Sequence, residues 1–589
     1  MKLKQKDFKR LNFLSLVQSP WLIFTFVAIL ASIFRLTNLQ LIEFKGDEGL
    51  NLFLATRPLF GHAFPPASLT SSVGILNFPL LNYFLFPIVL ISYYPPFVSG
   101  CIALLNILAI GVFFLTISKY FGKLTAFITS CFLAFSPWAI IYSRKIWAQD
   151  FLIPLVVGLL LCFFKIYIDK KKIYWLIFGI ISLFLMQIHQ TSGILPVLLF
   201  LVLLTKTKPN LKLLALGVLI GFLPTIPYLW YEISSSCPDC SALLMLHGRL
   251  QDYHPDIFMR IFQIVTTGYF HTILGNTDNL LFTTLFPLIG KISKIGYLIY
   301  LLLPVSAIIF WIKNKEYRSF LIMTALILVI FFMLKVQPEM HYVIILMPFL
   351  FLFLGFFISF LIVRKNLTLK LLGISLFVLF LTLYISFDYS FFSLLSTKKG
   401  FGGDYGGTFF VAQQTAQREL QTYKNSKDYN EMLLAFYVPL SSIQGDTPVG
   451  QILYPLKDLQ NNFSKIDSEL KVNPIDPRHY NEAVAYYTYP QNENLQNIFY
   501  LKKMSKDYSS YGKLYSISLG DFMSKNHKHF YSNGYVWFDF PEHWDLKEDN
   551  DTISVSDENV SFTISNSTEI AELDENMIWD KIQKNVAKQ

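Results

Sequence analysis

The stretch FVSGCIALLNILAIGVFFLTIS (residues 97–118) decides the fold, because it contains no charged side chain. An α-helix of about 20 apolar residues crosses the roughly 30 Å hydrocarbon core of a bilayer. Lys119 and Lys123 follow the stretch directly. Basic residues gather in the short cytoplasmic loops of membrane proteins. The stretch therefore predicts a transmembrane helix that ends at the cytoplasm.

The composition extends this prediction to the first two thirds of the chain. Of 589 residues, 53% are hydrophobic and 15% are charged, whereas about 25% are charged in an average globular domain. Residues 1–394 hold 30 Lys+Arg and 14 Asp+Glu, which leaves 19 and 26 of the totals of 49 and 40 for residues 395–589. The basic residues form short clusters between apolar runs, which indicates membrane topology and not a nucleic acid partner.

Eleven apolar segments predict membrane helices. They are residues 20–37, 97–118, 124–141, 151–168, 173–188, 191–205, 211–230, 295–312, 319–334, 342–363 and 367–387. The N-terminal MKLKQKDFKR is basic like a signal peptide, but no small-residue cleavage site precedes Arg35, so we expect a retained anchor. Basic clusters follow every second segment, which predicts a cytoplasmic N-terminus and an extracytoplasmic C-terminal region in a multi-pass protein of the cell membrane.

The apolar run GILNFPLLNYFLFPIVLISYY (residues 74–94) conflicts with this alternation if it crosses the membrane once. Its Asn and Pro residues make a poor lipid-facing helix. We interpret it as an interfacial or re-entrant segment of the first outer loop, residues 38–96. The alternative is that it crosses and that another weak segment does not.

The remaining chain predicts soluble structure. TKKGFGGDYGG (residues 397–407) is glycine-rich and predicts a hinge after a helical domain of residues 1–394. Residues 395–530 mix helical and strand patterns, which predicts an α/β or α+β domain. Residues 531–589 include a stretch that alternates at period two, which predicts a small β-module.

Two neighbouring acids in the first outer loop are candidates for chemistry. Asp47 and Glu48 lie about ten residues beyond the first predicted span. A carboxylate held within hydrogen-bonding distance of an acceptor hydroxyl or amine can act as a general base. The alternative is that the two acids cap the helix predicted to start at EGLNLFLA (residues 48–55).

A second candidate group lies in SPWAIIYSRKIWAQD (residues 136–150). Arg144 and Lys145 follow a span on the predicted outer side, against the usual bias for positive charge, and Asp150 opens the next span. Paired cations at this interface suit an anionic group such as a lipid phosphate. Snorkelling of both side chains to the headgroups is the alternative.

Further polar residues lie at the same predicted membrane face. His189 ends the fifth span, and His341 and Tyr342 begin the tenth. A lone interfacial histidine is more often structural, but three polar clusters around one leaflet favour a site. CPDC (residues 237–240), with His247 and His254, offers a local disulfide, two reduced thiols or a metal site, and the disulfide is favoured on an oxidising side.

The chain lacks several familiar sequence signatures. It contains no Walker-type phosphate loop, no His-Glu-x-x-His helix and no serine nucleophile elbow. The apolar segments also lack the row of acidic residues that would indicate an ion-coupled transporter. We therefore predict no cofactor and assign no metal ligands, and the sequence leaves open whether a divalent metal ion takes part.

The order of these motifs resembles a known family. DEG in the first loop, SPWAIIYSRKIWAQD, HQTSGILP (residues 189–196) and HYVIILMPF (residues 341–349) are similar to the GT-C membrane glycosyltransferases, in the protein O-mannosyltransferase and aminoarabinose-transferase-like branch. The resemblance covers roughly residues 20–390. Gly49 departs from it, since many relatives carry a larger residue there, and the C-terminal domains match no known acceptor-recognition module.

The resemblance implies a mainly α bundle of about 11–13 membrane helices. It implies that Asp47 matches the catalytic acid of the first loop, with Glu48 beside it. It also implies that the Arg144 region and Asp150 line the donor cavity, which His189, His341 and Tyr342 face.

The implied reaction moves a sugar from a polyprenyl-phosphate donor to a lipid, glycan or protein acceptor outside the cytoplasm, with inversion. A phosphate is already a good leaving group, so Asp47 would activate the acceptor while Arg144 and Lys145 stabilise the phosphate. A transporter or flippase for a lipid-linked glycan would use the same cations without a base. A membrane-anchored scaffold for cell-wall partners is the third hypothesis.

Overall fold

The computed structural model describes residues 20–60, 63–71, 74–235, 237, 239–240, 253–287, 289, 298–336 and 339–411, together with ten strands between residues 432 and 565. The chain divides into two compact units, Met1–Ala412 and Gln413–Gln589. We call the first the helical unit and the second the strand unit. The predicted domain boundary after residue 394 falls inside α22 (Leu367–Lys398), so the glycine-rich segment that follows this helix belongs to the helical unit.

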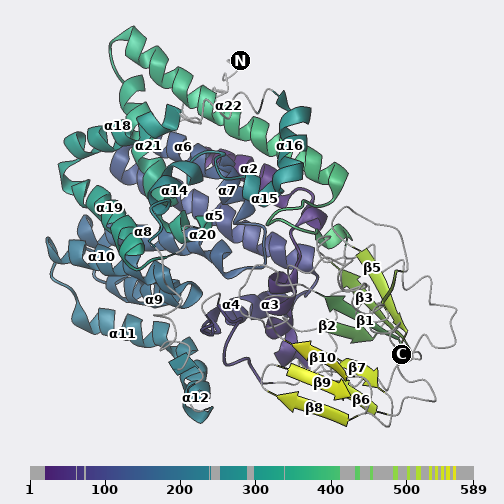
Figure 1. The fold of residues 1–589 in the computed structure, drawn as a ribbon. Coiled ribbons are helices and arrows are strands. Elements are labelled where there is room, and N and C mark those ends of the chain that lie inside the picture. Colours follow the sequence, from purple (N-terminus) through teal and green to yellow (C-terminus); the bar gives the residue numbers. More distant parts are fainter. Residues whose placement is uncertain are drawn as a thin grey trace, which may run out of the picture. The chain divides into compact units, whose positions relative to one another are not determined.

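A helix lies at every predicted span (Figure 1). The corresponding helices are α2 (Pro20–Leu36), α5 (Pro95–Phe121), α6 (Lys123–Phe135), α8 (Leu152–Tyr167), α9 (Tyr174–Ile188), α10 (Ile194–Leu204), α11 (Leu211–Phe222), α18 (Leu298–Lys313), α19 (Arg318–Met333), α21 (Met347–Ile362) and α22. Among the described residues, six helical stretches are long and apolar enough to cross a membrane: Pro95–Phe121, Ala148–Tyr167, Leu211–Ser234, Lys315–Met333, Met340–Ile362 and Leu367–Lys398. The predicted mainly α, multi-pass architecture is confirmed.

Shorter elements connect these helices. The α-helices are α3 (Gly46–Thr56), α4 (Leu80–Val89), α7 (Pro137–Ile141), α12 (Ile226–Ser234), α14 (Ile257–Ile264), α15 (His271–Leu274), α16 (Asn276–Leu285) and α20 (Met340–Val343). The 3-10 helices are η1 (Leu39–Leu41), η2 (Arg57–Phe60), η3 (Ala148–Phe151), η4 (Gln190–Gly193), η5 (Leu223–Thr225), η6 (Lys315–Tyr317) and η7 (Ile344–Leu346).

The ambiguous run at residues 74–94 forms only one short helix. α4 has 10 residues, with Pro87 inside it. About 20 residues are needed to span the hydrocarbon core, so α4 alone does not cross it. Leu80, Leu81 and Leu85 are buried, and α4 contacts α3, α5 and α9. These observations favour the interfacial or re-entrant interpretation.

The predicted span at residues 124–141 breaks near its end. α6 stops at Ser136, whose hydroxyl accepts a hydrogen bond from the Ala139 N–H at 3.5 Å and so caps α7. Pro137 at the first position of α7 has no N–H and cannot continue α6. The predicted span is therefore divided into α6 and the short α7. α7 ends at Ile141, just before the connecting segment at residues 142–147, which carries Lys145.

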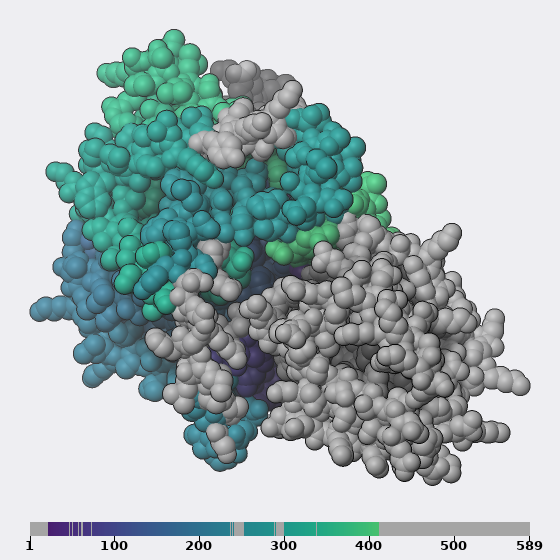
Figure 2. Space-filling view, in the orientation of Figure 1, coloured from purple at the N-terminus to yellow at the C-terminus, as the bar shows by residue number. Residues whose placement is uncertain are grey.

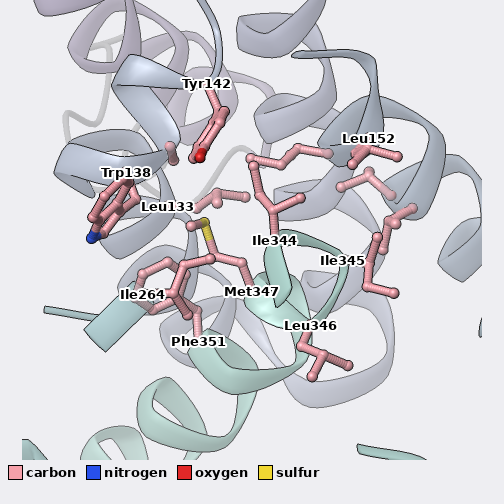
Figure 3. Close-up of a cluster of buried hydrophobic side chains, with 14 of the residues drawn as sticks. Leu133, Trp138, Tyr142, Leu152, Ile264, Ile344, Ile345, Leu346, Met347 and Phe351 are labelled. Atoms are coloured by element: carbon pink, nitrogen blue, oxygen red, sulfur yellow. The ribbon is translucent and has the colours of Figure 1, made fainter. Parts of the chain in front are cut away.

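The core of the helical unit lies directly below this segment. Figure 3 shows the side chains of Trp138 and Tyr142 beside residues of α6, α8, α14 and α21. The labelled members of this buried cluster are Leu133, Trp138, Tyr142, Leu152, Ile264, Ile344, Ile345, Leu346, Met347 and Phe351. Close packing of large apolar side chains makes such a core rigid. The segment at residues 142–147, which packs against this core, is therefore held in a fixed position.

Apolar side chains also cover much of the outer surface. α22, green in Figure 2, exposes 67% of Leu367 and 53% of Val378. Exposed apolar residues of this size along a 32-residue helix are typical of a surface that faces lipid.

The described strands of the strand unit form three sheets. Strands β1 (Met432–Tyr437), β2 (Ile452–Pro455), β3 (Glu482–Tyr487), β4 (Leu501–Lys503) and β5 (Lys513–Ser518) form a sheet in the order β2-β1-β3-β5-β4, in which only the β1–β3 pair is parallel. β6 (His529–Ser532) pairs with β7 (Trp537–Phe540). β8 (Asp545–Asp549), β9 (Thr552–Ser556) and β10 (Ser561–Ser565) form an antiparallel sheet within the stretch of period-two alternation. The segments between the strands lie outside the described residues, so the α/β or α+β class stays a prediction.

Candidate active site

The first loop is fixed by pairing with residues 399–411, which we call the glycine strap. Glu43 forms an antiparallel bridge with Thr408. The Phe44 N–H donates to the Gly407 carbonyl at 3.1 Å, and the Phe409 N–H donates to the Ile42 carbonyl at 3.0 Å. The sequence predicted a hinge at this place. In the structure the segment instead holds the first loop at the start of α3, where the candidate acids lie.

One glycine of the strap allows this close approach. Gly406 has a φ of +63°, a conformation that L side chains rarely adopt. A Cβ at this position would lie 2.7 Å from Cδ of Lys45. The glycine-rich composition therefore serves a tight contact with the first loop.

The two adjacent acids have different surroundings. Glu48 is 2% exposed, and its Oε2 accepts a hydrogen bond from the Lys45 N–H at 2.9 Å. This is the reach-back bond of a capping box at the start of α3, so Glu48 takes the capping role that the sequence offered as the alternative. Asp47 is half-buried. Of the two, Asp47 is the carboxylate more accessible to a substrate.

The protonation of both acids is perturbed by their surroundings. Burial raises the pKa of Asp47, while Lys45 and Lys145 lower it and Glu43 raises it. Burial is also the main cause that raises the pKa of Glu48 to about 7, with Glu43 adding to the effect. A carboxylate with a raised pKa is a stronger base, which suits proton abstraction near neutral pH.

A buried ionic group surrounds these acids. Glu43 is 2% exposed, and its Oε1 lies 2.6 Å from Nζ of Lys45. Its Oε2 forms an ion pair with Nζ of Lys145, which is itself buried. Lys45 also donates a hydrogen bond to the carbonyl of Asp404 in the glycine strap. One carboxylate thus joins lysines from the first loop and from the segment at residues 142–147.

Asp150 holds that second segment in place. Its Oδ2 accepts a hydrogen bond from the Lys145 N–H at 2.7 Å, and its side chain is fully buried. The Asp150 carbonyl accepts a bond from Asn106 Nδ2 at 3.0 Å, and Asn51 Nδ2 donates to the Ile146 carbonyl at 3.1 Å. Asp150 therefore holds the backbone at Lys145.

The structure places the Arg144 side chain at the C-terminal end of α2. Its guanidinium donates to the carbonyls of Phe34 and Asn38, the latter at 3.0 Å, and lies 4.6 Å from the ring centroid of Phe392. The side chain is 3% exposed. A cation that satisfies carbonyls at the C-terminal end of a helix stabilises that helix. Arg144 is thus committed to the end of α2, whereas Lys145 faces the acids.

The predicted histidines and Tyr342 meet in one aromatic group. The His189 and His341 rings lie 5.5 Å apart, and the His189 and Tyr342 rings 5.1 Å apart, between centroids. His341 lies 5.4 Å from Trp147, over whose ring Nζ of Lys145 sits at 5.0 Å. The structure therefore connects the aromatic group to the ionic group through Trp147.

The protonation state of His189 follows from its burial, which lowers its pKa to about 4. Its Nδ1 is 2.8 Å from the Thr191 hydroxyl. At neutral pH the imidazole is uncharged. It can take part in hydrogen bonding and ring packing but not in charge stabilisation.

The disulfide interpretation of CPDC is confirmed. Cys237 and Cys240 are bonded, with a Cα–Cα distance of 5.3 Å. Asp239 between them is 5% exposed and accepts hydrogen bonds from the Leu76 N–H at 3.1 Å and from the Tyr228 hydroxyl. His247 lies outside the described residues. Within the described part of the chain, no group of three His, Cys, Asp or Glu side chains is arranged to hold a metal ion.

Sequence reasoning missed Glu43, Lys45, Trp147 and Asp404. Lys45 and Glu43 stand within four residues of Asp47, so their proximity was available as a signal. Asp404 is 357 residues away from Asp47 in the chain, and only the folded glycine strap brings it to Lys45.

A family comparison matches the central part of the helical unit. Residues 98–231 match the family described as dolichyl-phosphate-mannose-protein mannosyltransferase. The matched segment includes Lys145, Asp150 and His189, whereas Asp47 and His341 lie outside it. No curated protein matches the chain significantly.

The solved structures to which the chain is similar include ArnT from Cupriavidus metallidurans in the apo state, with 12% identity, a TM-score of 0.48, and coverage of 85% of this chain and 98% of ArnT. ArnT bound to undecaprenyl phosphate gives 13% identity, a TM-score of 0.47, and coverage of 84% and 97%. The Archaeoglobus fulgidus oligosaccharyltransferase in complex with Zn and sulfate gives 15% identity, a TM-score of 0.39, and coverage of 69% and 56%.

The family match agrees with the resemblance drawn from the sequence motifs, and the apolar helices are those of a multi-pass membrane protein. Over residues 98–231 the chain is similar to the dolichyl-phosphate-mannose-protein mannosyltransferases.

Proposed function

We propose that the protein transfers a sugar from a polyprenyl-phosphate donor to an acceptor outside the cytoplasm, with inversion at the anomeric carbon. The observation that carries the proposal is the half-buried Asp47 among the ammonium groups of Lys45 and Lys145. The donor class is supported by the name of the matched family, which acts from dolichyl-phosphate mannose.

In the proposed reaction Asp47 is the general base. The acceptor hydroxyl or amine attacks the anomeric carbon while Asp47 takes its proton. The bond from this carbon to the phosphate oxygen breaks, and polyprenyl phosphate leaves with the electron pair. A single displacement of this kind inverts the anomeric configuration. The base has only to reach the acceptor, because the phosphate needs no protonation to leave.

The lysines suit the other half of this reaction. Negative charge develops on the bridging phosphate oxygen as the bond breaks, and preorganised cations in a water-poor site stabilise it. Lys145 is buried, and its ammonium is held by Glu43 beside the ring of Trp147. We assign the phosphate contact to Lys145 and not to Arg144, whose donors reach backbone carbonyls of Phe34 and Asn38.

The disulfide supports an extracytoplasmic site. Asp239, inside the Cys237–Cys240 loop, binds the backbone of Leu76 in the first loop, so these two loops lie on one side of the helical unit. Disulfides persist in oxidising compartments and are rare in the cytosol. The side that carries α3 and Asp47 is therefore proposed to face away from the cytoplasm.

A transfer assay on the purified full-length protein tests the proposal. Labelled polyprenyl-phosphate mannose serves as donor and a detergent extract of membranes as the pool of acceptors. Asp47→Asn keeps the shape of the side chain but removes the base, and transfer is expected to fall by roughly 100-fold or more. Asp169→Asn is the matched control. Asp169 pairs with Lys119 in the last turn of α5, whereas the segment at residues 142–147 lies near the first turn of that helix.

Undiminished transfer by folded Asp47→Asn would exclude Asp47 as the base. Retention of the anomeric configuration in the product, measured by NMR spectroscopy, would exclude the single displacement. Comparing the glycans of cells with and without the protein by mass spectrometry would identify the sugar and the acceptor.

A further inference from the structure

Glu43 contacts both lysines that surround Asp47. Its Oε1 lies 2.6 Å from Nζ of Lys45, and its Oε2 pairs with Nζ of Lys145. The exposed fractions of the three side chains are 1% for Glu43, 19% for Lys45 and 10% for Lys145. A carboxylate so far removed from solvent interacts strongly with its partners, since water screens it little.

Backbone contacts hold Glu43 and Lys145 in place without the Glu43 side chain. Glu43 itself is held by the bridge to Thr408 in the glycine strap. Lys145 is held by the bond from its N–H to Asp150. A lysine side chain has four rotatable bonds and several accessible rotamers, so a fixed backbone does not fix the position of the ammonium. Glu43 contacts the ammonium groups of both lysines, whereas the Asp404 carbonyl contacts that of Lys45 and the Trp147 ring that of Lys145.

The charges around Asp47 come from two segments. Lys45 and Glu43 lie in its own loop, Glu48 follows it in α3, and Lys145 reaches it from residues 142–147. Glu43 therefore acts on Asp47 in two ways. It pairs with two cations whose charges lower the pKa of Asp47, and its own negative charge raises that pKa.

We propose that Glu43 is a positioning residue, whose buried carboxylate aims the ammonium groups of Lys45 and Lys145 at Asp47 and at the donor phosphate. The inference rests on the proposed function, and it adds a residue that contacts neither substrate. Glu43 is thus distinct from a simple structural ion pair, because its loss has to change phosphate binding and the pH dependence of turnover.

The first test shortens the side chain but keeps its charge. In Glu43→Asp the carboxylate cannot reach both lysines from the same backbone position. We expect the Kd for polyprenyl phosphate, measured with the purified full-length protein in lipid nanodiscs, to rise about tenfold, which equals roughly 1.4 kcal/mol.

The second test removes the charge but keeps the size. Burial and Glu43 both raise the pKa of Asp47, and the two lysines lower it. In Glu43→Gln the lysines remain cationic and the neighbouring negative charge is lost, so the pKa of Asp47 falls. We expect the acidic limb of kcat/KM to move to lower pH in the transfer assay.

The matched control is Glu316→Gln, the same change in an exposed ion pair, 3.6 Å long, with Lys206. It should alter neither the Kd for polyprenyl phosphate nor the acidic limb of the pH profile of kcat/KM. Unchanged Kd in Glu43→Asp together with an unmoved limb in Glu43→Gln, with or without a lower thermal midpoint, would overturn the inference. If Glu43→Gln does not fold, an unchanged Kd in Glu43→Asp alone suffices to overturn it.

The proposed function can fail separately. If the wild-type protein does not bind polyprenyl phosphate, or if Asp47→Asn transfers sugar normally, the donor or the base is wrong. If the wild type binds polyprenyl phosphate, Asp47→Asn is inactive and both Glu43 variants behave like wild type, only the role of Glu43 is wrong.

Discussion

The Tyr405 hydroxyl donates a hydrogen bond to the Leu41 carbonyl at 2.6 Å and joins the glycine strap to the loop that carries Asp47. Tyr405 is 3% exposed and packs against Phe391 and Phe401. The first loop is therefore held by a segment that follows α22, and Tyr405 lies 364 residues after Leu41 in the chain.

Tyr405→Phe tests this fastening. The ring packing remains, but the Leu41 carbonyl loses a buried donor. We expect the free energy of unfolding to fall by about 1–2 kcal/mol and turnover to fall because the first loop is less firmly held. Thermal unfolding and the transfer assay on the same preparation measure both effects. Tyr389→Phe is the control, since Tyr389 is 68% exposed on α22. An unaltered midpoint in Tyr405→Phe would show that the bond contributes little.

Arg144 and Lys145 are adjacent but should respond differently to substitution. Arg144→Met leaves the carbonyls of Phe34 and Asn38 without their charged donor, so we expect a loss of roughly 2–3 kcal/mol in the free energy of unfolding. The Kd for polyprenyl phosphate, measured on the folded fraction, should change little.

Lys145→Met removes the proposed phosphate contact, so Kd should rise about tenfold or more. Thermal midpoints and binding isotherms for the two variants provide the comparison. A larger rise in Kd for Arg144→Met than for Lys145→Met would reverse this assignment and restore Arg144 as the phosphate ligand.

Glu48 predicts a pH-dependent stability. Its pKa is raised from the ordinary value of 4.5 to about 7, so the folded state binds a proton more tightly than the unfolded state. The stability that Glu48 contributes is fully present below about pH 4.5 and is lost as the pH rises through about 7.

Glu48→Gln keeps an acceptor for the Lys45 N–H but does not titrate. We expect the thermal midpoint of this variant to depend less on pH between 5 and 8 than that of the wild type, while Glu316→Gln at an exposed site retains the wild-type dependence. Parallel curves for Glu48→Gln and the wild type would contradict the assignment to Glu48.

Asp239 predicts a link between the disulfide loop and the first loop. Asp239→Asn weakens the acceptor for the Leu76 N–H and the Tyr228 hydroxyl, and we expect a loss of roughly 1–3 kcal/mol in the free energy of unfolding. Reduction of the Cys237–Cys240 bond should lower the thermal midpoint in the same direction. The double variant Cys237→Ser/Cys240→Ser serves as control, since a reductant should not affect it. Equal sensitivity to reductant in both proteins would place the effect elsewhere in the chain.

The sequence by itself determined the membrane helices and their approximate ends. A long apolar run within the bilayer has few alternatives to an α-helix, because every backbone N–H and C=O there needs a partner within the protein. The same reasoning found Asp47, Lys145, Asp150, His189 and His341, since polar groups at the ends of apolar segments stand out against their surroundings.

Only the tertiary structure decided which groups each of these residues contacts. The pattern DE left open which acid caps α3, and the backbone geometry gives that role to Glu48. The pattern RK left open whether Arg144 and Lys145 bind a phosphate or extend to the headgroups, and in the structure Arg144 contacts carbonyls at the end of α2. The glycine strap and Glu43 act through contacts between residues far apart in the chain. Hydrophobicity is a property of each segment, so it can be recognised locally, whereas hydrogen bonds and ion pairs at the site depend on where distant segments meet.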